Sequence, residues 1–567
     1  MSIIDWIIFI AYLALTIFIG LFKSRRGKDI EAYYLGNRSI PWWAVGLSVM
    51  ATQASAITFI GTTGQAFNDG MRFIQIYLPL PFVVIILCVT FAPFFYRARV
   101  YTAYEYLERR FDTKTRALTS FLFQCSRGMS VGIVIYAPSV VLSIMLGWNE
   151  KTTILIMGAT TLLYTAMGGV RAVVWTDTMQ MILMFIGLFA GLYLVISALP
   201  GDVSFSDAIY LGGVTNHWNA IDTSINPANQ YTLLSGLVGG FFLMLSYFGC
   251  DQSQVQRYIT AGSIKESRMS LVMTAILKVP MQFLILATGV FLFVFYQFER
   301  PPAFFNPAEI RRVEESSSRD AFHKSREEFD LVFDRRKETG ERLLEARRRG
   351  DSVETERLLI DFNNADKEVK ATRAKIIEVV KSVPGSNTND VNYVFPSFIL
   401  KYVPIGLVGL MISVIFAAAM SSIAGEIAAL SSATMVDFYK RYFKPQASDL
   451  HYLRAGQACT LFWGAFATLI AMFAGGWGTS LVETVNKVGS HFYGPILGVF
   501  LLAFLVKRSN GTDAFAGAIA GLVAVLFTSY KLEISWLYLN AIGPVVVLVV
   551  GIASSFIIPR PSESRKS

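Results

Sequence analysis

The sequence predicts an all-α membrane protein, because its composition is strongly apolar and its apolar residues gather in stretches long enough to cross a bilayer. The 567 residues are 53% hydrophobic and only 16% charged, whereas soluble domains carry about 25% charged residues. A helix crosses the hydrocarbon core with about 20 consecutive apolar residues. Most of the chain is therefore expected to face lipid or other apolar helices.

About thirteen transmembrane helices are expected. The apolar stretches are 4–22, 42–67, 73–96, 118–146, 152–167, 173–199, 231–252, 271–298, 395–438, 455–474, 480–505, 514–529 and 534–557. The first has neither a basic segment before it nor a small-residue cleavage site, so we expect it to be retained. The four cysteines lie inside such stretches without metal-ligand spacing, and no cofactor is expected.

Lysine and arginine residues occur mainly in every second loop. The basic loops hold Lys23, Arg25, Arg26, Lys28, Arg38, Arg97, Arg99, Arg109, Arg110, Lys114, Arg116, Arg171, Arg257, Lys265, Arg268, Lys440, Arg441, Lys444, Arg454, Lys507, Arg508, Arg560, Arg565 and Lys566. Because short cytoplasmic loops are positively charged, we expect the amino terminus outside the cell membrane and the carboxyl terminus in the cytoplasm. This sidedness explains the net charge of +9, so no nucleic-acid partner is expected.

Segment 300–395 interrupts this pattern with 19 basic and 19 acidic residues. Long loops cross the membrane regardless of charge, so we expect it on the extracytoplasmic side. Its helix-forming composition predicts a helical hairpin, with Gly350 in the turn and Asp351 capping the second helix. A solvated charged spacer and a lid or partner-docking element are about equally compatible with this pattern.

Small and polar residues inside two stretches point to a site. Residues 51–65 are rich in threonine and glycine, which suits either an unwound segment lining a cavity or close helix packing. In a later stretch, Ser421 and Ser422 are adjacent hydroxyls. They suit a hard cation, which prefers oxygen ligands, although serines also hydrogen-bond within their own helix.

Ionisable residues inside membrane helices are costly and tend to mark function. The candidates are Arg127, Asp177, Lys278, Glu426, Glu483, Lys487 and His491. Asp177 and Lys278 also suit helix ends, where charge is tolerated. For Arg127 and Glu426 we favour an interior ion pair over direct contact with a bound solute.

Three motifs resemble the sodium:solute symporter family. The most specific is GATTLLYTAMGGVRAVVWTD at 158–177, followed by SYFGCDQSQVQR at 246–257 and a looser match at 507–518. The resemblance covers essentially the whole membrane portion. It implies a LeuT-like fold of two inverted five-helix repeats, with the first helix of each repeat broken at the membrane midplane.

The resemblance also implies a division of the chain. We expect a leading transmembrane helix and cytoplasmic loop (1–40), a first inverted repeat (41–199), an extracytoplasmic loop (200–230), the start of the second repeat (231–299), the charged helical insert (300–395), the rest of the second repeat (396–505), and two peripheral helices with a short cytoplasmic tail (506–567).

For the coupling ion, the resemblance implies one sodium site. Its ligands would be the backbone carbonyls of Ala51, Ala54 and Ala418 and the hydroxyls of Ser421 and Ser422. Asp177 would lie nearby. Relatives with a second sodium place hydroxyls where this chain has Ala424 and Gly425, so one sodium per cycle is expected.

The solute cavity departs from the sugar carriers of the family. The residues expected to line it are Gln53, Thr58, Tyr77, Met244, Ser246, Lys278, Asn486 and His491. Lys278 matches a cavity lysine of a sugar carrier, and Tyr247 matches the tyrosine that closes the inner gate. This set suggests a hydroxylated or anionic solute.

The resemblance therefore implies a secondary active transporter that carries a small polar or anionic solute into the cell with sodium by alternating access. A proton-coupled carrier using Glu426 or Asp177 is one alternative. A solute sensor that docks a partner protein through the 300–395 hairpin is another. No enzyme is expected, because no nucleophile, base and orienting group can be read from the spans. The expected partners are the solute, sodium and the lipid bilayer, with a possible protein partner for the insert.

Overall fold

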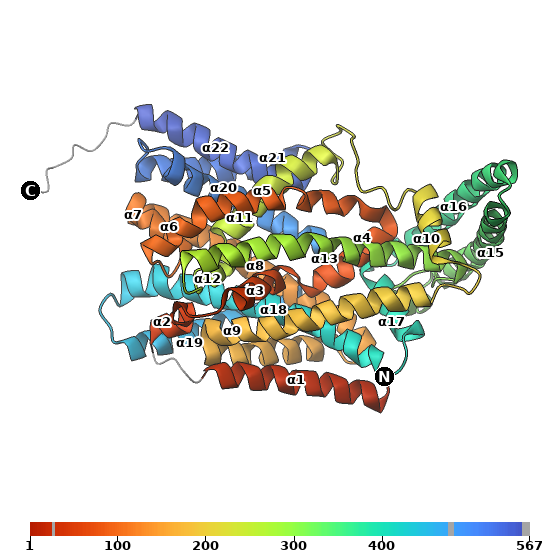
Figure 1. The fold of residues 1–567 in the computed structure, drawn as a ribbon, viewed down its shortest axis with the longest axis horizontal. Coiled ribbons are helices and arrows are strands. Elements are labelled where there is room, and N and C mark those ends of the chain that lie inside the picture. The colour runs from red at the N-terminus through yellow and green to blue at the C-terminus, as the bar shows by residue number, and fades with distance from the viewer. Residues whose placement is uncertain (25–28, 475–480, 558–567) are drawn as a thin grey trace, which may run out of the picture.

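The computed structural model describes residues 1–24, 29–474 and 481–557, and these ranges contain helices but no β-strand (Figure 1). The helices of the first part are α1 (Ile3–Ser24), α2 (Ile30–Leu35), α3 (Trp42–Gln53), α4 (Ala56–Asp69), α5 (Leu80–Val89), α6 (Phe91–Ala98), α7 (Ala103–Arg110), α8 (Thr113–Leu146) and α9 (Glu150–Ser197). Those of the middle part are α10 (Phe205–Val214), α11 (Gly240–Cys250), α12 (Gln252–Tyr258), α13 (Ile264–Phe298), α14 (Pro307–Glu314), α15 (Arg319–Arg349), α16 (Ser352–Lys381) and α17 (Val394–Tyr402). The last part has α18 (Leu407–Ala433), α19 (Asp449–Phe473), α20 (Leu481–Leu505), α21 (Gly511–Lys531) and α22 (Trp536–Ile557).

Ten helical stretches in the described ranges are long and apolar enough to cross a membrane. They confirm an all-α, multi-pass membrane protein. The count is lower than thirteen because the predicted stretches 152–167 and 173–199 form one helix, α9, and 231–252 becomes the shorter apolar helix Ser235–Cys250. Likewise, a single span, Ala56–Ala98, takes in the end of 42–67 together with 73–96. The number of crossings thus stays a prediction.

The bend in α9 depends on a glycine of the 158–177 motif. Gly169 has φ 57° and ψ −160°, a conformation that only glycine adopts without strain. A Cβ at this position would lie 2.4 Å from the carbonyl oxygen of Tyr33. Gly169 therefore allows both the change of direction and the close approach of α2.

Helix α18 lies at the centre of the bundle. It packs against α1, α3, α8 and α9, and nearly all of its residues are buried. A side chain on any face of α18 therefore meets another helix, which is why polar groups on it must find partners inside the protein.

The two ends of the bundle differ. Figure 1 shows the amino terminus at the same end as the α15–α16 hairpin, whereas α22 finishes at the opposite end, where α2, α7 and α12 also lie. Helix α7 at that second end carries two basic residues in its last turn, Arg109 and Arg110. The charged hairpin and the basic loops are thus on opposite sides of the bundle.

The charged insert forms two long paired helices. Gly350 has φ 74° and ends α15, and Asp351 caps α16 by accepting a hydrogen bond from the backbone N–H of Glu354. Phe329 of α15 and Phe362 of α16 are both buried. The two helices therefore have an apolar seam, which a solvated spacer does not need.

Arginines of α15 attach the hairpin to the bundle. Arg336 donates to the backbone carbonyl of Tyr296 at 3.0 Å and pairs with Asp366 at 3.3 Å. Burial lowers the pKa of Arg336 to about 10, which leaves it charged at neutral pH. Arg348 pairs with the buried Asp207 of α10 at 2.7 Å, and the neighbouring Arg347 does so at 2.9 Å.

Removing the contacts to Asp207 should loosen the tip of the hairpin. We expect R347A/R348A to be cleaved near the 350 turn about fivefold faster in limited proteolysis, because two half-exposed ion pairs together contribute roughly 1 kcal/mol. R349A is the matched control, since Arg349 pairs with Glu345 of the same helix. Equal cleavage of the two variants would show that the tip is held by other contacts.

Candidate functional site: a cavity beside a broken helix

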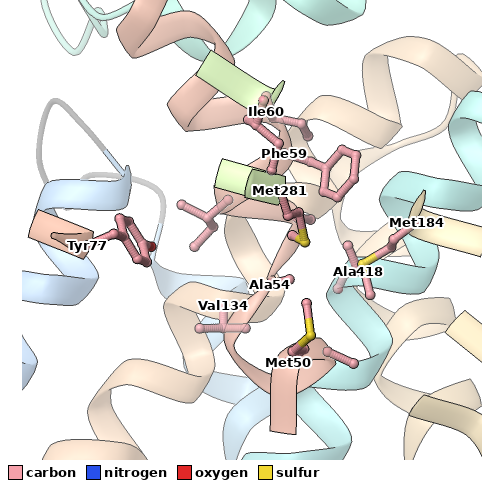
Figure 2. Close-up of a cluster of buried hydrophobic side chains, with 14 of the residues drawn as sticks. Met50, Ala54, Phe59, Ile60, Tyr77, Val134, Met184, Met281 and Ala418 are labelled. Carbon is pink, nitrogen blue, oxygen red and sulfur yellow. The ribbon is translucent and has the colours of Figure 1, made fainter. Parts of the chain in front are cut away.

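The polar stretch 51–65 contains a break between two helices, as the interpretation of an unwound segment requires. Helix α3 ends at Gln53, and Ala54 has non-helical angles of φ −83° and ψ 69°. Ser55 then caps α4 by accepting from the backbone N–H of Thr58. Figure 2 shows Ala54 in this interruption, with Ala418 on the neighbouring helix α18. The break leaves carbonyl groups at the end of α3 without helical partners.

The serine pair of α18 meets these carbonyls. The Ser421 hydroxyl donates to the Ala51 carbonyl at 3.0 Å, and the Ser422 hydroxyl donates to the Thr52 carbonyl at 3.1 Å. Both hydroxyls also lie near the Ala418 carbonyl, at 3.2 and 3.3 Å. Five neutral oxygens thus converge between α3 and α18, a donor set that suits a hard monovalent cation.

Asp177 lies in the next layer of polar contacts rather than among these oxygens. Its Oδ2 accepts a 2.6 Å hydrogen bond from Ser48, and the Arg257 guanidinium lies 3.5 Å away. Ser48 is connected to the cation-site layer, since its carbonyl accepts from the Thr52 hydroxyl at 2.9 Å. Asp177 is fully buried in α9 rather than at a helix end.

Arg257 corrects one sequence-based expectation. The sequence places Arg257 among the basic loop residues, but the structure buries it fully. Its guanidinium can be buried because it donates hydrogen bonds to Asp177, Ser48 and the Ser253 carbonyl. A Cβ at Gly425 would lie 2.5 Å from its Nη2. The guanidinium therefore occupies the space beside Gly425.

A cavity of about 110 Å³ opens beside the helix break. Its lining is Thr52, Gln53, Ser55, Ile57, Thr58, Thr62, Phe73, Ile76, Tyr77, Arg127, Val134, Leu243, Met244, Tyr247, Ser422, Glu426, Val485, Asn486, Tyr493 and Trp536. Of the residues expected in a solute cavity, Gln53, Thr58, Tyr77, Met244 and Asn486 are brought together here. Tyr247 is with them, and Ser422 joins this cavity to the cation-site oxygens.

Three residues expected in the cavity are not part of its lining. Ser246 donates its hydroxyl to a backbone carbonyl of α20 at 2.7 Å. Lys278 is fully buried, with its Nζ 5.7 Å from the centre of the Tyr77 ring. The His491 ring lies 2.9 Å from the hydroxyl of Ser529, between α20 and α21.

A buried ion triad forms the charged part of the lining. Arg127 of α8 contacts Asp251 at 2.7 Å and Glu426 at 2.8 Å. Arg127 and Glu426 thus form the expected interior ion pair, and both also line the cavity. Its guanidinium carbon also lies 5.1 Å from the centre of the Tyr247 ring. The side chain of Glu483 lies outside the described residues.

Four polar residues of the site were not predicted as parts of it, namely Ser48, Thr52, Asp251 and Arg257. Asp251 and Arg257 both belong to the 246–257 motif, at the two ends of α12. Asp251 is the N-cap residue between α11 and α12, so an acidic cap between two short helical stretches was the available signal. Thr52 lies in the polar 51–65 stretch, which was its signal, whereas Ser48 carried none.

Comparison with known proteins agrees with this arrangement. The description of the sodium:solute symporter family matches residues 33–320 and 371–521. The chain belongs to this family. Within it, the symporter is 26% identical over 560 residues to the sodium/sialic acid symporter SiaT of Proteus mirabilis (strain HI4320), covering 97% of this chain and 94% of SiaT. It is 26% identical over 542 residues to the sodium/glucose cotransporter of Vibrio parahaemolyticus, covering 94% and 86%.

One solved structure has the same fold over almost the full length. It shows the substrate-bound outward-open state of a Na+-coupled sialic acid symporter, with a TM-score of 0.77, 25% identity and 98% of each chain covered. Membership of the family makes this chain a sodium-coupled symporter, and the proton-coupled and sensor alternatives are not favoured. The internal segment between the two matched ranges, 321–370, falls on α15 and the first part of α16.

Removing Arg127 should destabilise the symporter strongly. We expect R127M to lose about 3–5 kcal/mol, because two buried carboxylates are left without a counterion. The triple variant R127M/D251N/E426Q should recover most of the loss, since it also removes both negative charges. Thermal unfolding of the detergent-solubilised protein measures both. If the triple variant unfolds as early as R127M, the loss comes from packing rather than charge.

Proposed function

We propose that this symporter couples solute uptake to one Na+ bound between α3 and α18. The proposed ligands are the carbonyls of Ala51, Ala54 and Ala418 and the hydroxyls of Ser421 and Ser422. The Thr52 carbonyl, which accepts from the Ser422 hydroxyl, is a further candidate at the same helix end. The observation that carries this proposal is the contact of both serine hydroxyls with carbonyls at the broken end of α3. In the absence of a cation these hydroxyls donate to the carbonyls; with Na+ bound, the same oxygens can all turn their lone pairs to the ion.

A stoichiometry of one sodium is supported by Arg257. Ala424 and Gly425 offer no hydroxyls after the serine pair, and the Arg257 guanidinium fills the space beside Gly425. A positive charge already neutralises Asp177 there. A second cation would meet like charge at that place.

Coupling follows from the shared residue Ser422. It belongs to the proposed sodium ligands and also lines the cavity next to Gln53 and Thr58. Sodium binding that holds α3 against α18 therefore also orders the solute cavity, and linkage makes each ligand increase the affinity for the other. One charge crossing 100 mV supplies about 2.3 kcal/mol for accumulation of the solute.

Tyr247 is proposed as the inner gate of this alternating-access cycle. Its hydroxyl is 2.9 Å from the side-chain amide of Gln254 in α12, and its ring lies 6.1 Å from that of Tyr493. Tyr247 and Tyr493 both line the cavity, which supports a role of these contacts in closing it. Opening to the cytoplasm would require the ring and α12 to separate.

The finer architecture is proposed with it. Thirteen crossings in two inverted repeats place the amino terminus and the hairpin outside and the carboxyl terminus in the cytoplasm. The opposite placement of the hairpin and the basic helix α7 in Figure 1 supports this orientation. The apolar seam of the hairpin and its attachment to α10 and α13 support a role as a docked cap, where a partner protein could bind.

Uptake into proteoliposomes tests the sodium site. With labelled sugars, carboxylates, amino acids, amines and sialic acids, we expect uptake to need an inward sodium gradient. S421A and S422A should each raise the sodium concentration for half-maximal uptake roughly tenfold, since losing one polar contact to a charged group costs about 1.5 kcal/mol. The double variant should show no sodium dependence.

Ser413→Ala is the matched control. Ser413 is buried in the same helix, and its hydroxyl donates to the Gly409 carbonyl of α18 itself. Its removal should leave the sodium dependence unchanged. Sodium-driven uptake that persists in S421A/S422A would place the coupling ion elsewhere.

A further inference from the structure

The charges that line the solute cavity are unequal. Arg127 and Glu426 are the charged side chains in its described lining, and Arg127 is shared between Glu426 and Asp251. Two carboxylates therefore share one guanidinium, and the group carries one negative charge when both are ionised. Lys278 does not line the cavity, and the charges of Asp177 and Arg257 offset each other.

One carboxylate oxygen of this group lacks a hydrogen-bond donor. Glu426 is only 4% exposed. Its Oε1 accepts from Arg127, while its Oε2 is buried without a hydrogen-bond partner in the described part of the chain. The second oxygen of Asp251, by contrast, accepts from the backbone N–H of Ser253. A buried carboxylate oxygen without a donor is costly, so a donor is expected at Glu426 Oε2.

Other groups of the lining also suit a donor with positive charge. Oε1 of Gln53 is a second buried acceptor that lacks a partner among the described residues. The rings of Phe73, Tyr77 and Trp536 line the same space, and aromatic faces attract cations. Arg127 itself lies against two of the lining tyrosines, which shows this preference within the site.

The proposed sodium does not take this place. Ser422 and Glu426 are four residues apart in α18, one helical turn. Sodium held by Ser421 and Ser422 makes the potential near Glu426 less negative. Its ligands, however, lie one helical turn before Glu426. The free oxygen of Glu426 is left to the solute.

We propose that the solute carries a protonated amine, which donates to Glu426 Oε2 between the aromatic side chains, and that a carboxylate at the same place is rejected. This rests on the proposed sodium-coupled uptake and narrows its solute class. Trp536 Nε1, which also lacks a partner among the described residues, can donate to a hydroxyl of the solute. The expected solute is thus a small hydroxylated amine.

Three probes with one skeleton test the proposal on the full-length protein. They are 3-amino-1-propanol, 1,3-propanediol and 3-hydroxypropionate, which are cationic, neutral and anionic. In sodium, we expect the amine to raise the unfolding temperature at a concentration at least tenfold below that needed for the diol, and the carboxylate to have no effect. E426Q should weaken amine binding at least tenfold, because a charge-assisted hydrogen bond is lost.

The control variant is E108Q. Glu108 is likewise paired with an arginine, Arg116, but lies outside the cavity lining, so E108Q should bind the amine as the unchanged protein does. Stabilisation by the carboxylate, no stabilisation by the amine, or equal amine binding in E426Q would each overturn the proposal. Equal amine binding in E426Q would mean that a water molecule donates the hydrogen bond to Glu426 Oε2.

Sodium-dependent stabilisation without any probe separates the two proposals. If sodium stabilises the protein and S421A/S422A abolishes this, the sodium site stands even when the amine fails to bind. If E426Q also abolishes the sodium effect, Glu426 is a sodium ligand, and the proposed solute contact is wrong. The ranking of the three probes on the unchanged protein decides the question even if E426Q does not fold.

Discussion

The need to satisfy backbone polar groups inside a membrane shapes the centre of this protein. Within the hydrocarbon region an interrupted helix is tolerated only where protein groups take up the freed carbonyls. Here α3 ends at Gln53, and the hydroxyls of Ser421 and Ser422 reach the carbonyls of Ala51 and Thr52. The broken helix and the serine pair therefore depend on each other. The same contact produces a set of oxygens suited to a cation and one wall of the cavity.

Two buried guanidinium groups connect that centre to the surrounding helices. Arg127 joins α8 to Asp251 and to α18, and Arg257 joins α12 to α3 and α9. Both sets of arginine contacts involve α12, which begins after Asp251 and carries Arg257 in its last turn. A displacement of this seven-residue helix would change the cavity lining and the layer behind the serine pair together. Buried ion pairs add little net stability but are strongly destabilising when one partner is removed, so they restrict which arrangements the bundle can adopt.

The α15–α16 hairpin is stabilised by different contacts from those in the bundle. Segment 300–395 carries basic and acidic residues in equal number, and its apolar side chains pack along the seam of α15 and α16. It meets the bundle through arginines that bind Asp207 and the end of α13. The family match omits residues 321–370, which make up most of the hairpin.

Local patterns in the sequence were enough for the membrane class, the helical hairpin with its Gly350 turn and Asp351 cap, and the family. Each depends on neighbouring residues: apolar runs of bilayer length, capping chemistry, and the 158–177 motif. The serine pair and the polar break could also be picked out, because hydroxyls and glycines are unusual inside membrane helices.

The tertiary structure alone decided which partners these groups have. The Thr52 carbonyl accepts from the serine pair, and Arg257 makes a buried contact with Asp177 instead of lying in a loop. Arg127 pairs with Asp251 as well as with Glu426. Lys278 and His491 lie outside the cavity lining. Hydrogen bonds and ion pairs between residues 80 or more positions apart depend on how helices pack, and no periodicity or spacing along the chain records that.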